Sequence, residues 1–196
     1  MLQIRIHGRG GQGVVTAAEM LSLAAFEQGR HAQAFPSFGS ERTGAPVVAF
    51  CRIDDGEIRL REPVLAPDVL IVQDPTLLHQ VDVFQGLQPD GYVLINSKRD
   101  FHELGLAEIS QRFRHERLMT VAATEIALKH LGRPLPNAVL LGGFAALSGL
   151  ITLDAVAHAI RAKFSGKVAD GNVAAAGEAF EFVKKEMREL AHAQAD

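Results

Sequence analysis

The sequence has a single cysteine, Cys51, one tyrosine and no tryptophan among its 196 residues. One cysteine excludes a disulfide within the chain. It also excludes an iron–sulfur cluster held by this chain alone, because such clusters take about four thiolates. Cys51 lies within an apolar strand pattern and has no histidine neighbour, so we expect a small buried side chain and not a nucleophile. Any redox centre that works with this chain is therefore expected on another chain.

Long apolar runs and an excess of one charge are also missing. The longest apolar run, residues 138–151, has about 14 residues interrupted by glycines, whereas a helix that spans a bilayer needs roughly 20. No basic-then-apolar signal opens the chain. The net charge is −3, and the lysines and arginines are scattered, which argues against nucleic-acid binding. We therefore expect a cytoplasmic protein that binds neither a membrane nor nucleic acid.

Complete catalytic and metal-binding patterns are absent from the sequence as well. None of the eight histidines lies three or four residues from another with a carboxylate partner, so no metal site is predicted. There is no G-x-S-x-G elbow, P-loop lysine or cysteine–histidine arrangement. Asp74 is the best isolated acid, but its position before Pro75 favours a helix cap. We assign no catalytic residue.

What the sequence does have is the pattern of one α/β domain. A hydrophobic content of 47% against 22% charged residues is enough to bury a full core. We predict a single domain over residues 1–196, with a three-layer, Rossmann-like, mostly parallel sheet, flanking helices and a β-hairpin. After a first strand that begins at residue 3, strands are predicted at 31–35, 47–53, 57–60, 69–72, 92–95 and 118–122. The predicted strands 47–53 and 57–60 would form the hairpin, turned at Asp54-Asp55-Gly56. Helices are predicted at 14–28, 77–84, 124–132, 138–150, from 152 onward, and at 168–192.

Four glycines fall between residues 8 and 13, where the first strand meets the first helix. Gly8, Gly10 and Gly13 satisfy G-x-G-x-x-G, the dinucleotide-binding pattern, in the required context. Such glycines let a ligand approach the backbone, and the free N–H groups of the following helical turn attract phosphate or carboxylate. A Rossmann site also needs an acidic residue about 20 positions further on, but the chain has residues 31–34, His-Ala-Gln-Ala, there. The alternative is that the glycines only permit a tight turn and close helix packing.

A second unusual segment, residues 35–44, is rich in proline, glycine and hydrogen-bond donors. Such a mixture beside two aromatic rings is expected around a polyanionic ligand or at a subunit contact, although a solvated loop is an alternative. Lys98 and Arg99 follow a predicted strand and are weak candidates for a phosphate contact, with a solvated loop the favoured interpretation. Asn137 is a candidate N-cap for a helix that is apolar nearly all round. We expect that helix to be buried in the core or against another subunit.

Together, four motifs in order resemble the gamma subunit, or gamma domain, of the 2-oxoacid:acceptor (ferredoxin) oxidoreductases, the pyruvate synthase type. The motifs are G-R-G-G-Q-G-V from Gly8, F-P-S-F-G-S-E-R-T-G-A from Phe35, A-P-D-V-L-I-V-Q-D from Ala66, and N-A-V-L-L-G-G-F-A-A-L-S-G from Asn137. The resemblance covers nearly the whole chain and ends with Gly171-Asn172-Val173-Ala174, at the start of the last predicted helix.

The resemblance implies a component of a multi-subunit enzyme that converts 2-oxoacid, CoA and oxidised acceptor into acyl-CoA, CO2 and reduced acceptor. It implies thiamine diphosphate on alpha and beta subunits, [4Fe-4S] clusters on beta and delta-type subunits, and ferredoxin or another acceptor as the indirect electron partner. This chain would contribute to coenzyme A binding and assembly, while substrate choice would rest largely with the thiamine-bearing subunits. Two alternatives remain: a free-standing dinucleotide-binding reductase, and a purely structural gamma homologue.

The resemblance also carries residue roles onto this sequence. The family's S-x-R-x-G-like segment falls on Ser40, Arg42, Thr43 and Gly44, and its helix-opening asparagine falls on Asn137. Arg42 would pair with a phosphate of coenzyme A, and Asn137 would hydrogen-bond its pantetheine or adenine portion. The adjoining cleft would be lined by Gly10, Gly11, Gln12 and Gly13. Many relatives have a glycine where this chain has Thr43, which puts backbone contacts at Thr43 in doubt more than the role of Arg42.

Overall fold

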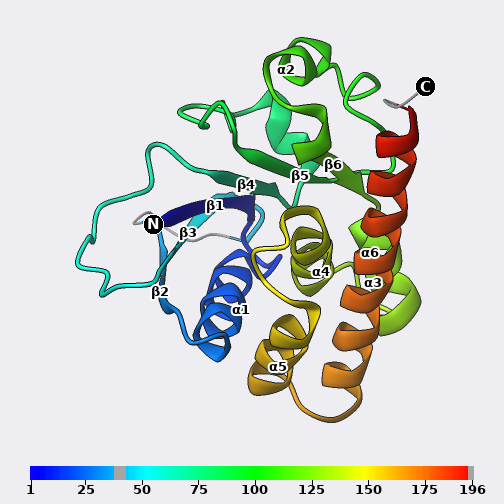
Figure 1. Ribbon diagram of the computed structural model, residues 1–196. Coiled ribbons are helices and arrows are strands. Elements are labelled where there is room, and N and C mark those ends of the chain that lie inside the picture. Colours follow the sequence, from blue (N-terminus) through cyan, green and yellow to red (C-terminus); the bar gives the residue numbers. More distant parts are fainter. Residues whose placement is uncertain (38–42, 194–196) are drawn as a thin grey trace.

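The computed structural model describes residues 1–37 and 43–193, which form a six-stranded sheet covered on both faces (Figure 1). The strands are β1 (Leu2–Arg9), β2 (His31–Pro36), β3 (Pro46–Asp54), β4 (Val69–Val72), β5 (Tyr92–Asn96) and β6 (Leu118–Val121). The helices are α1 (Val14–Glu27), α2 (Ala107–Arg112), α3 (Ala123–Leu131), α4 (Asn137–Ser148), α5 (Leu153–Lys163) and α6 (Gly166–Ala193), with short 3-10 helices η1 (Pro75–His79) and η2 (His115–Arg117). No helix within these residues is long and apolar enough to cross a bilayer.

The strand order β2-β3-β1-β4-β5-β6 divides the sheet into two parts. β1, β4, β5 and β6 run parallel, whereas β3 is antiparallel to both of its neighbours, β1 and β2. The prediction of one α/β domain with a mostly parallel sheet is thus confirmed. The predicted hairpin of 47–53 with 57–60 is wrong, because residues 57–60 form no strand. Both edges of β3 are already paired, because β3 lies between β1 and β2 and is antiparallel to each.

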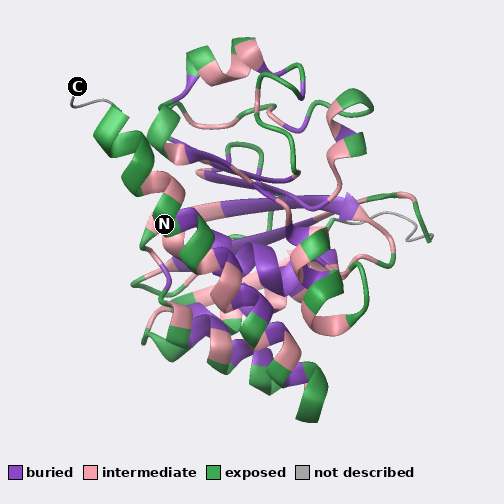
Figure 2. Ribbon diagram, turned by 90° about the vertical axis from the view of Figure 1, so that its right-hand side faces the viewer, coloured by how far each residue is buried: buried purple, intermediate pink, exposed green. Residues whose placement is uncertain are grey.

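The larger core lies between one face of the sheet and helices α1, α4, α5 and α6 (Figure 1). The central helix α4 is buried along almost its whole length, as its apolar sequence predicts, and it shows as the purple helix beneath the sheet in Figure 2. It packs closely on α6 because Gly142 has no side chain. A Cβ at Gly142 would lie 2.1 Å from the carbonyl oxygen of Ala176. Thr152 caps α5 by accepting from the Ala155 N–H, which confirms the predicted helix start.

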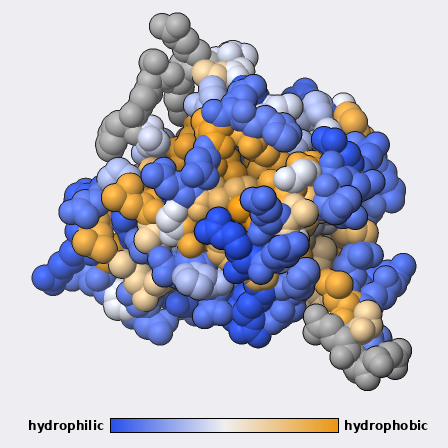
Figure 3. All heavy atoms as spheres, turned by 90° about the horizontal axis from the view of Figure 1, so that it is seen from above, coloured by the Kyte–Doolittle hydropathy of each residue, from blue (hydrophilic) through white to orange (hydrophobic). Residues whose placement is uncertain are grey.

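The opposite face of the sheet has a smaller apolar cluster over β4–β6 and irregular chain elsewhere. Seen from this side in Figure 3, hydrophobic side chains gather near the centre of the face and hydrophilic ones surround them. The helix predicted at 77–84 is reduced to η1, and Leu77 and Val83 reach the cluster from separate turns. Two buried arginines hold the irregular segments. Arg5 donates to the carbonyls of Val83 (2.8 Å) and Gln85 (2.6 Å), and Arg52 donates to that of Glu62 (2.5 Å).

His7 lies on this same face of β1, two residues from Arg5, and is buried. Burial, followed by the positive charge of Arg5, lowers the pKa of His7 to about 4 from 6.5. Folding therefore requires the neutral imidazole, whereas the unfolded chain takes up a proton below pH 6.5. The contribution of neutral His7 to the free energy of unfolding is fully present above pH 6.5 and is lost as the pH falls toward 4.

Replacement of Gly142 by alanine tests the helix contact. We expect Gly142→Ala to lower the free energy of unfolding by about 1–3 kcal/mol, since the methyl group meets backbone atoms that cannot rotate away. Gly177→Ala is the matched control, because Gly177 lies in α6 and a Cβ there meets nothing within 4 Å. It should be neutral or stabilising by about 0.5–1 kcal/mol. Urea unfolding measures both, and equal effects of the two substitutions would contradict the close approach of α4 and α6.

The effect of His7 on the pH dependence of stability is tested by measuring unfolding at several pH values. The shift from 6.5 to about 4 corresponds to about 3 kcal/mol of stability lost between these pH values in the native sequence. His7→Gln should make the decline between pH 6.5 and 4 shallower by that amount, whatever its effect at neutral pH. His192→Gln, an exposed change in the last turn of α6, should leave the slope unaltered. A slope that His7→Gln does not change would contradict a buried neutral His7.

Candidate functional site

The glycine turn joins the end of β1 to the start of α1, and its backbone depends on glycine. Gly11 and Gly13 have φ angles of 91° and 70°, in the left-handed region that glycine alone adopts without strain. Gly8 is needed for a different reason, since a Cβ there would lie 2.5 Å from Cγ2 of Val14. The strand, turn and helix predicted from the sequence are confirmed, and the first turn of α1 opens with no acidic residue to occupy its N–H groups.

Gln12 fixes the turn through both ends of its amide. Its Oε1 accepts from the backbone N–H of Arg9 (2.8 Å), and its Nε2 donates to Oδ2 of Asp74 (2.8 Å). The backbone of Gln12 is held as well, since Nε2 of Gln73 donates to its carbonyl oxygen (2.8 Å). Gln73 is buried, and its Oε1 has no partner within the described residues. The turn is thus held by Gln73 and Asp74, the two residues that follow β4.

Asn137 supports the turn from the helical side. Its Nδ2 donates to the carbonyl oxygen of Gly13 (3.3 Å), and its Oδ1 accepts from the backbone N–H of Ala138 (2.9 Å). The residue is only 5% exposed. The N-cap of α4 is Pro136, so the prediction that Asn137 caps this helix is wrong by one position. Asn137 is instead the first residue of α4, and its amide is turned toward Gly13. A Cβ added at Gly13 would lie 2.5 Å from Nδ2 of Asn137.

The end of the β2–β3 connection attaches directly to the glycine turn. Gly10 donates to the carbonyl oxygen of Ala45 (2.9 Å), and Gly44 donates back to that of Gly10 (3.1 Å). Gly10 and Thr43 form a parallel bridge. The structure therefore brings Thr43 and Gly44 against the turn. Ser40 and Arg42, the other two residues of that motif, lie outside the described residues.

Arg9 is a site residue that the sequence interpretation did not single out. Its Nη1 donates to the carbonyl oxygen of Gly44 (3.1 Å), and its Nε lies 3.2 Å from Oδ2 of Asp74. Its Nη2 also reaches Thr76 Oγ1 (2.7 Å) and Gln80 Oε1 (2.9 Å). Arg9 thus ties the β2–β3 connection to η1. The one signal in the sequence is its position inside the glycine motif.

Asp74 is the carboxylate at the centre of this network. It caps η1 by accepting from the backbone N–H of Thr76 (3.0 Å), which confirms the predicted cap. Partial burial alone would raise its pKa, but hydrogen bonds from Thr76 and Gln12, together with the charge of Arg9, hold the pKa below its ordinary value. Asp74 is therefore an ionised structural anchor near neutral pH and not a proton donor.

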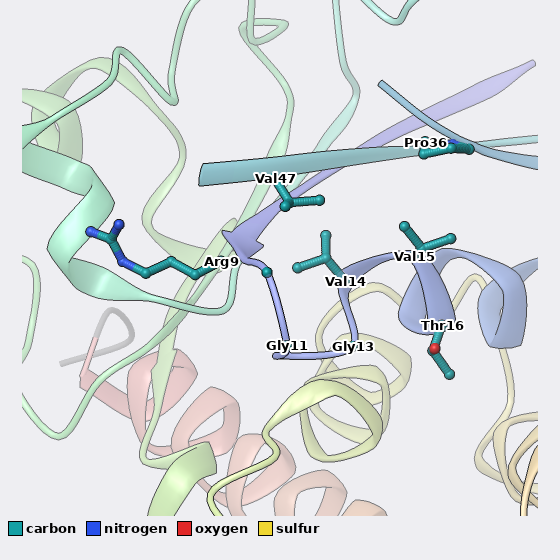
Figure 4. Close-up of a pocket in the computed structure, with 9 residues that line it drawn as sticks. Arg9, Gly11, Gly13, Val14, Val15, Thr16, Pro36 and Val47 are labelled. Carbon is teal, nitrogen blue, oxygen red and sulfur yellow. The ribbon is translucent and has the colours of Figure 1, made fainter. Parts of the chain in front are cut away.

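Two hollows open on either side of the turn. One of about 340 Å³ lies between the first turn of α1 and the strands β2 and β3. In Figure 4 the side chains of Val14, Val15, Pro36 and Val47 face this space, while Arg9 points away from it. The other, of about 530 Å³, lies at the carboxyl ends of the parallel strands and is lined by Gly10, Gly11, Gln12 and Thr43 on one side. Asn96, Thr124 and the segment 134–136 line its other side.

The remaining candidates take other roles. Lys98 pairs with Glu125 (3.0 Å). Together with Arg99 they line a hollow that adjoins the 530 Å³ one, since Asn96 and Thr124 line both. Cys51 is fully buried within β3, as predicted, and burial raises the pKa of its thiol to about 12. No group of three or more metal-binding side chains occurs among the residues that the structure describes.

The strand order also bears on the dinucleotide alternative. In a Rossmann site the acidic residue stands at the carboxyl end of a parallel strand next to β1. Here the antiparallel strand β3 separates β1 from β2, the strand that follows α1, and β2 ends in Phe35 and Pro36 without a carboxylate. The other neighbour of β1, the parallel strand β4, is followed by Asp74, but that carboxylate is already engaged by Gln12, Thr76 and Arg9. The geometry therefore disfavours a free-standing nicotinamide site.

Comparison with known proteins places this geometry in a family. Residues 3–182 match the family model for pyruvate ferredoxin/flavodoxin oxidoreductase. The chain is 48% identical over 185 residues to pyruvate synthase subunit PorC from Methanothermobacter thermautotrophicus, covering 94% of this chain and 97% of that protein. It is also 48% identical over 181 residues to the pyruvate/ketoisovalerate oxidoreductases common subunit gamma of Pyrococcus abyssi, covering 92% of this chain and 96% of that one.

Solved structures agree. The crystal structure of pyruvate oxidoreductase subunit PORC from Thermotoga maritima is 38% identical, with a TM-score of 0.77 over 92% of this chain and 95% of that one. A 2-oxoglutarate:ferredoxin oxidoreductase from Magnetococcus marinus, solved with 2-oxoglutarate, coenzyme A and succinyl-CoA bound, shares the fold at 18% identity and a TM-score of 0.74, over 31% of its chain. The suspected resemblance is confirmed: the chain belongs to the pyruvate ferredoxin/flavodoxin oxidoreductase family, as a component of a multi-subunit oxidoreductase that corresponds to the PorC or gamma subunit of its relatives.

Proposed function

We propose that this chain binds coenzyme A for the oxidoreductase complex, at the glycine turn and the adjoining end of the β2–β3 connection. The observation that carries the proposal is the direct attachment of Thr43 and Gly44 to Gly10, which joins two motifs that are about thirty residues apart in the sequence. The coenzyme A bound in the Magnetococcus marinus structure, a protein of the same fold, supports a site for this substrate in such a complex.

The turn suits the phosphate groups of coenzyme A. The N–H groups of the first turn of α1 have no acidic side chain competing for them, and the helix dipole favours an anion there. Gly11 presents its backbone to open space, since a Cβ at this position meets nothing within 4 Å. We place the phosphates at Gly10, Gly11 and Gly13, with Gln12 holding the turn and Arg42 supplying a charged partner.

The pantetheine arm needs hydrogen-bonding groups and apolar contacts. The 530 Å³ hollow offers Asn96 and Thr124 with prolines on its far side, and it is also lined by Gln73, whose buried Oε1 has no partner within the described residues. A direct contact of Asn137 with the pantetheine or adenine portion stays a prediction. The described role of Asn137 is to support Gly13, which would keep the phosphate-binding turn in place.

The redox chemistry belongs to other subunits in this proposal. Thiamine diphosphate would supply the decarboxylation chemistry on alpha and beta subunits, and [4Fe-4S] clusters on beta and delta-type subunits would pass electrons to ferredoxin. The donor set of this chain does not fit a cluster, because its one thiol is buried with a pKa of about 12. The chain's own steps are to capture coenzyme A, orient it and assemble with the subunits that react it, all within the cytoplasm.

The Gly11 position tests the phosphate site. Gly11→Ala would place a methyl group in the space proposed for the phosphates, and we expect it to raise the KM of the complex for coenzyme A at least tenfold. Gly105→Ala is the control, because Gly105 also has a positive φ and open surroundings but lies far along the chain, before α2. Both changes carry similar backbone strain. Equal KM values in the two variants would contradict the proposed site.

The Arg42 position tests the charged contact. Loss of a charge-assisted hydrogen bond to phosphate costs about 1.5–3 kcal/mol, so Arg42→Ala should raise the KM for coenzyme A about ten- to hundredfold. Thiamine-dependent decarboxylation without coenzyme A should continue at its normal rate. Arg59→Ala, which removes an exposed arginine that pairs with Glu57, should change neither quantity. An unchanged coenzyme A requirement in Arg42→Ala would count against the assignment and favour a purely structural subunit.

A further inference from the structure

A further cavity lies on the helical side of the molecule, with Asn137, which supports Gly13 of the glycine turn, in its wall. It has a volume of about 280 Å³ and forms where the α3–α4 connection meets the end of α5 and the start of α6. Its walls come from four apolar side chains, one arginine and two asparagines: Leu131, Leu135, Phe164, Val168, Arg133, Asn137 and Asn172.

The floor of this cavity is rigid and polar. Asn172 is 4% exposed, and its Nδ2 donates to the carbonyl oxygen of Val168 (2.9 Å), which leaves Oδ1 as the atom that can accept from an occupant. The neighbouring Gly171 lets α6 approach the end of α3, because a Cβ there would lie 2.7 Å from Leu131 Cδ2. Asn137 is held by Gly13 and Ala138. The cavity is therefore shaped by packing, and it needs no rearrangement to receive a side chain.

The rim combines an exposed apolar surface with a positive charge. Val168 is 53% exposed, although it lies in the first turn of α6 beside the half-buried Phe164. Arg133 is exposed and makes no ion pair within the described residues, whereas the neighbouring Lys129 is paired with Glu178. An apolar cavity beside an unneutralised guanidinium complements a bulky apolar side chain that is followed or preceded by a carboxylate.

We propose that this cavity, lined by Leu131, Arg133, Leu135, Phe164, Val168 and the asparagines 137 and 172, receives an anchor segment of another subunit of the complex. The segment carries a large apolar side chain that fills the cavity and an acidic residue that pairs with Arg133. This inference deepens the assembly part of the proposed function and rests on it. It does not depend on where coenzyme A binds, because assembly is measured separately from KM.

The test uses the whole complex, purified through a tag on a partner subunit and analysed by native mass spectrometry. Val168→Glu should reduce the share of complexes that contain this chain at least tenfold, because a carboxylate would enter the apolar rim. Phe182→Glu is the matched control: Phe182 is also an exposed apolar residue of α6, at 40%, and does not line the cavity. That variant should be retained like the native chain. Both substitutions are at exposed sites, and circular dichroism of each chain checks its folding.

The ionic part of the proposal has its own measurement. Retention of the native chain should fall as salt is raised, and Arg133→Ala should weaken retention at low salt while removing most of that salt dependence. Full retention of Val168→Glu, or equal loss of Val168→Glu and Phe182→Glu, would overturn the docking site. An intact complex with a raised coenzyme A KM in Val168→Glu would also overturn it, and would assign the cavity to a small molecule. Failure of the coenzyme A proposal would instead appear in the Gly11 and Arg42 variants, with assembly unaffected.

Discussion

The antiparallel pairing of β3 with β1 is the constraint on which the site depends. The two strands are in register from Leu2 opposite Ile53 to Arg9 opposite Pro46. Because β3 runs against β1, its first residue lies beside the last residue of β1, and the chain just before β3 is delivered to the glycine turn. A parallel strand in the same place would begin at the opposite edge of the sheet. The antiparallel direction of β3 thus brings together the glycine turn and residues 43–45, which are distant in the sequence.

The same pairing changes what a dinucleotide-binding pattern can do. The glycines keep their local function, which is to expose backbone N–H groups at the start of a helix. The second strand, which carries the ribose-binding carboxylate in a Rossmann site, is separated from β1 by β3, and residues 43–45 lie against the turn with Arg9 bound to Gly44. Asp74 is then used to hold Arg9 and Gln12 and is not offered to a ligand. The glycine pattern of a dinucleotide-binding site is thus combined with residues 43–45 and not with a ribose-binding carboxylate.

Much of this structure could be predicted from local sequence. The strand 69–72 was placed correctly because four apolar residues stand between Asp68 and Asp74, and α1, α5 and α6 follow their helical periodicity and, for α5, the Thr152 cap. What failed depends on pairing between distant residues. The Asp-Gly turn after β3 indicates a hairpin locally, but β1 and β2 occupy both edges of β3. The role of Arg9 rests on Asp74, 65 positions away, and that of Asn137 on Gly13, 124 positions away. No local pattern reveals such partners.

The burial of Cys51 has a practical consequence. Its thiol sits in β3, the strand that joins β1 to β2 at the centre of the site's architecture, with no exposure to solvent and a pKa of about 12. A thiol reagent can reach it only when the core between this face of the sheet and its helices opens. Because the chain has no other cysteine, the rate of modification reports the opening of the core at this one position. The protein therefore contains a built-in probe for the integrity of the core that supports this strand.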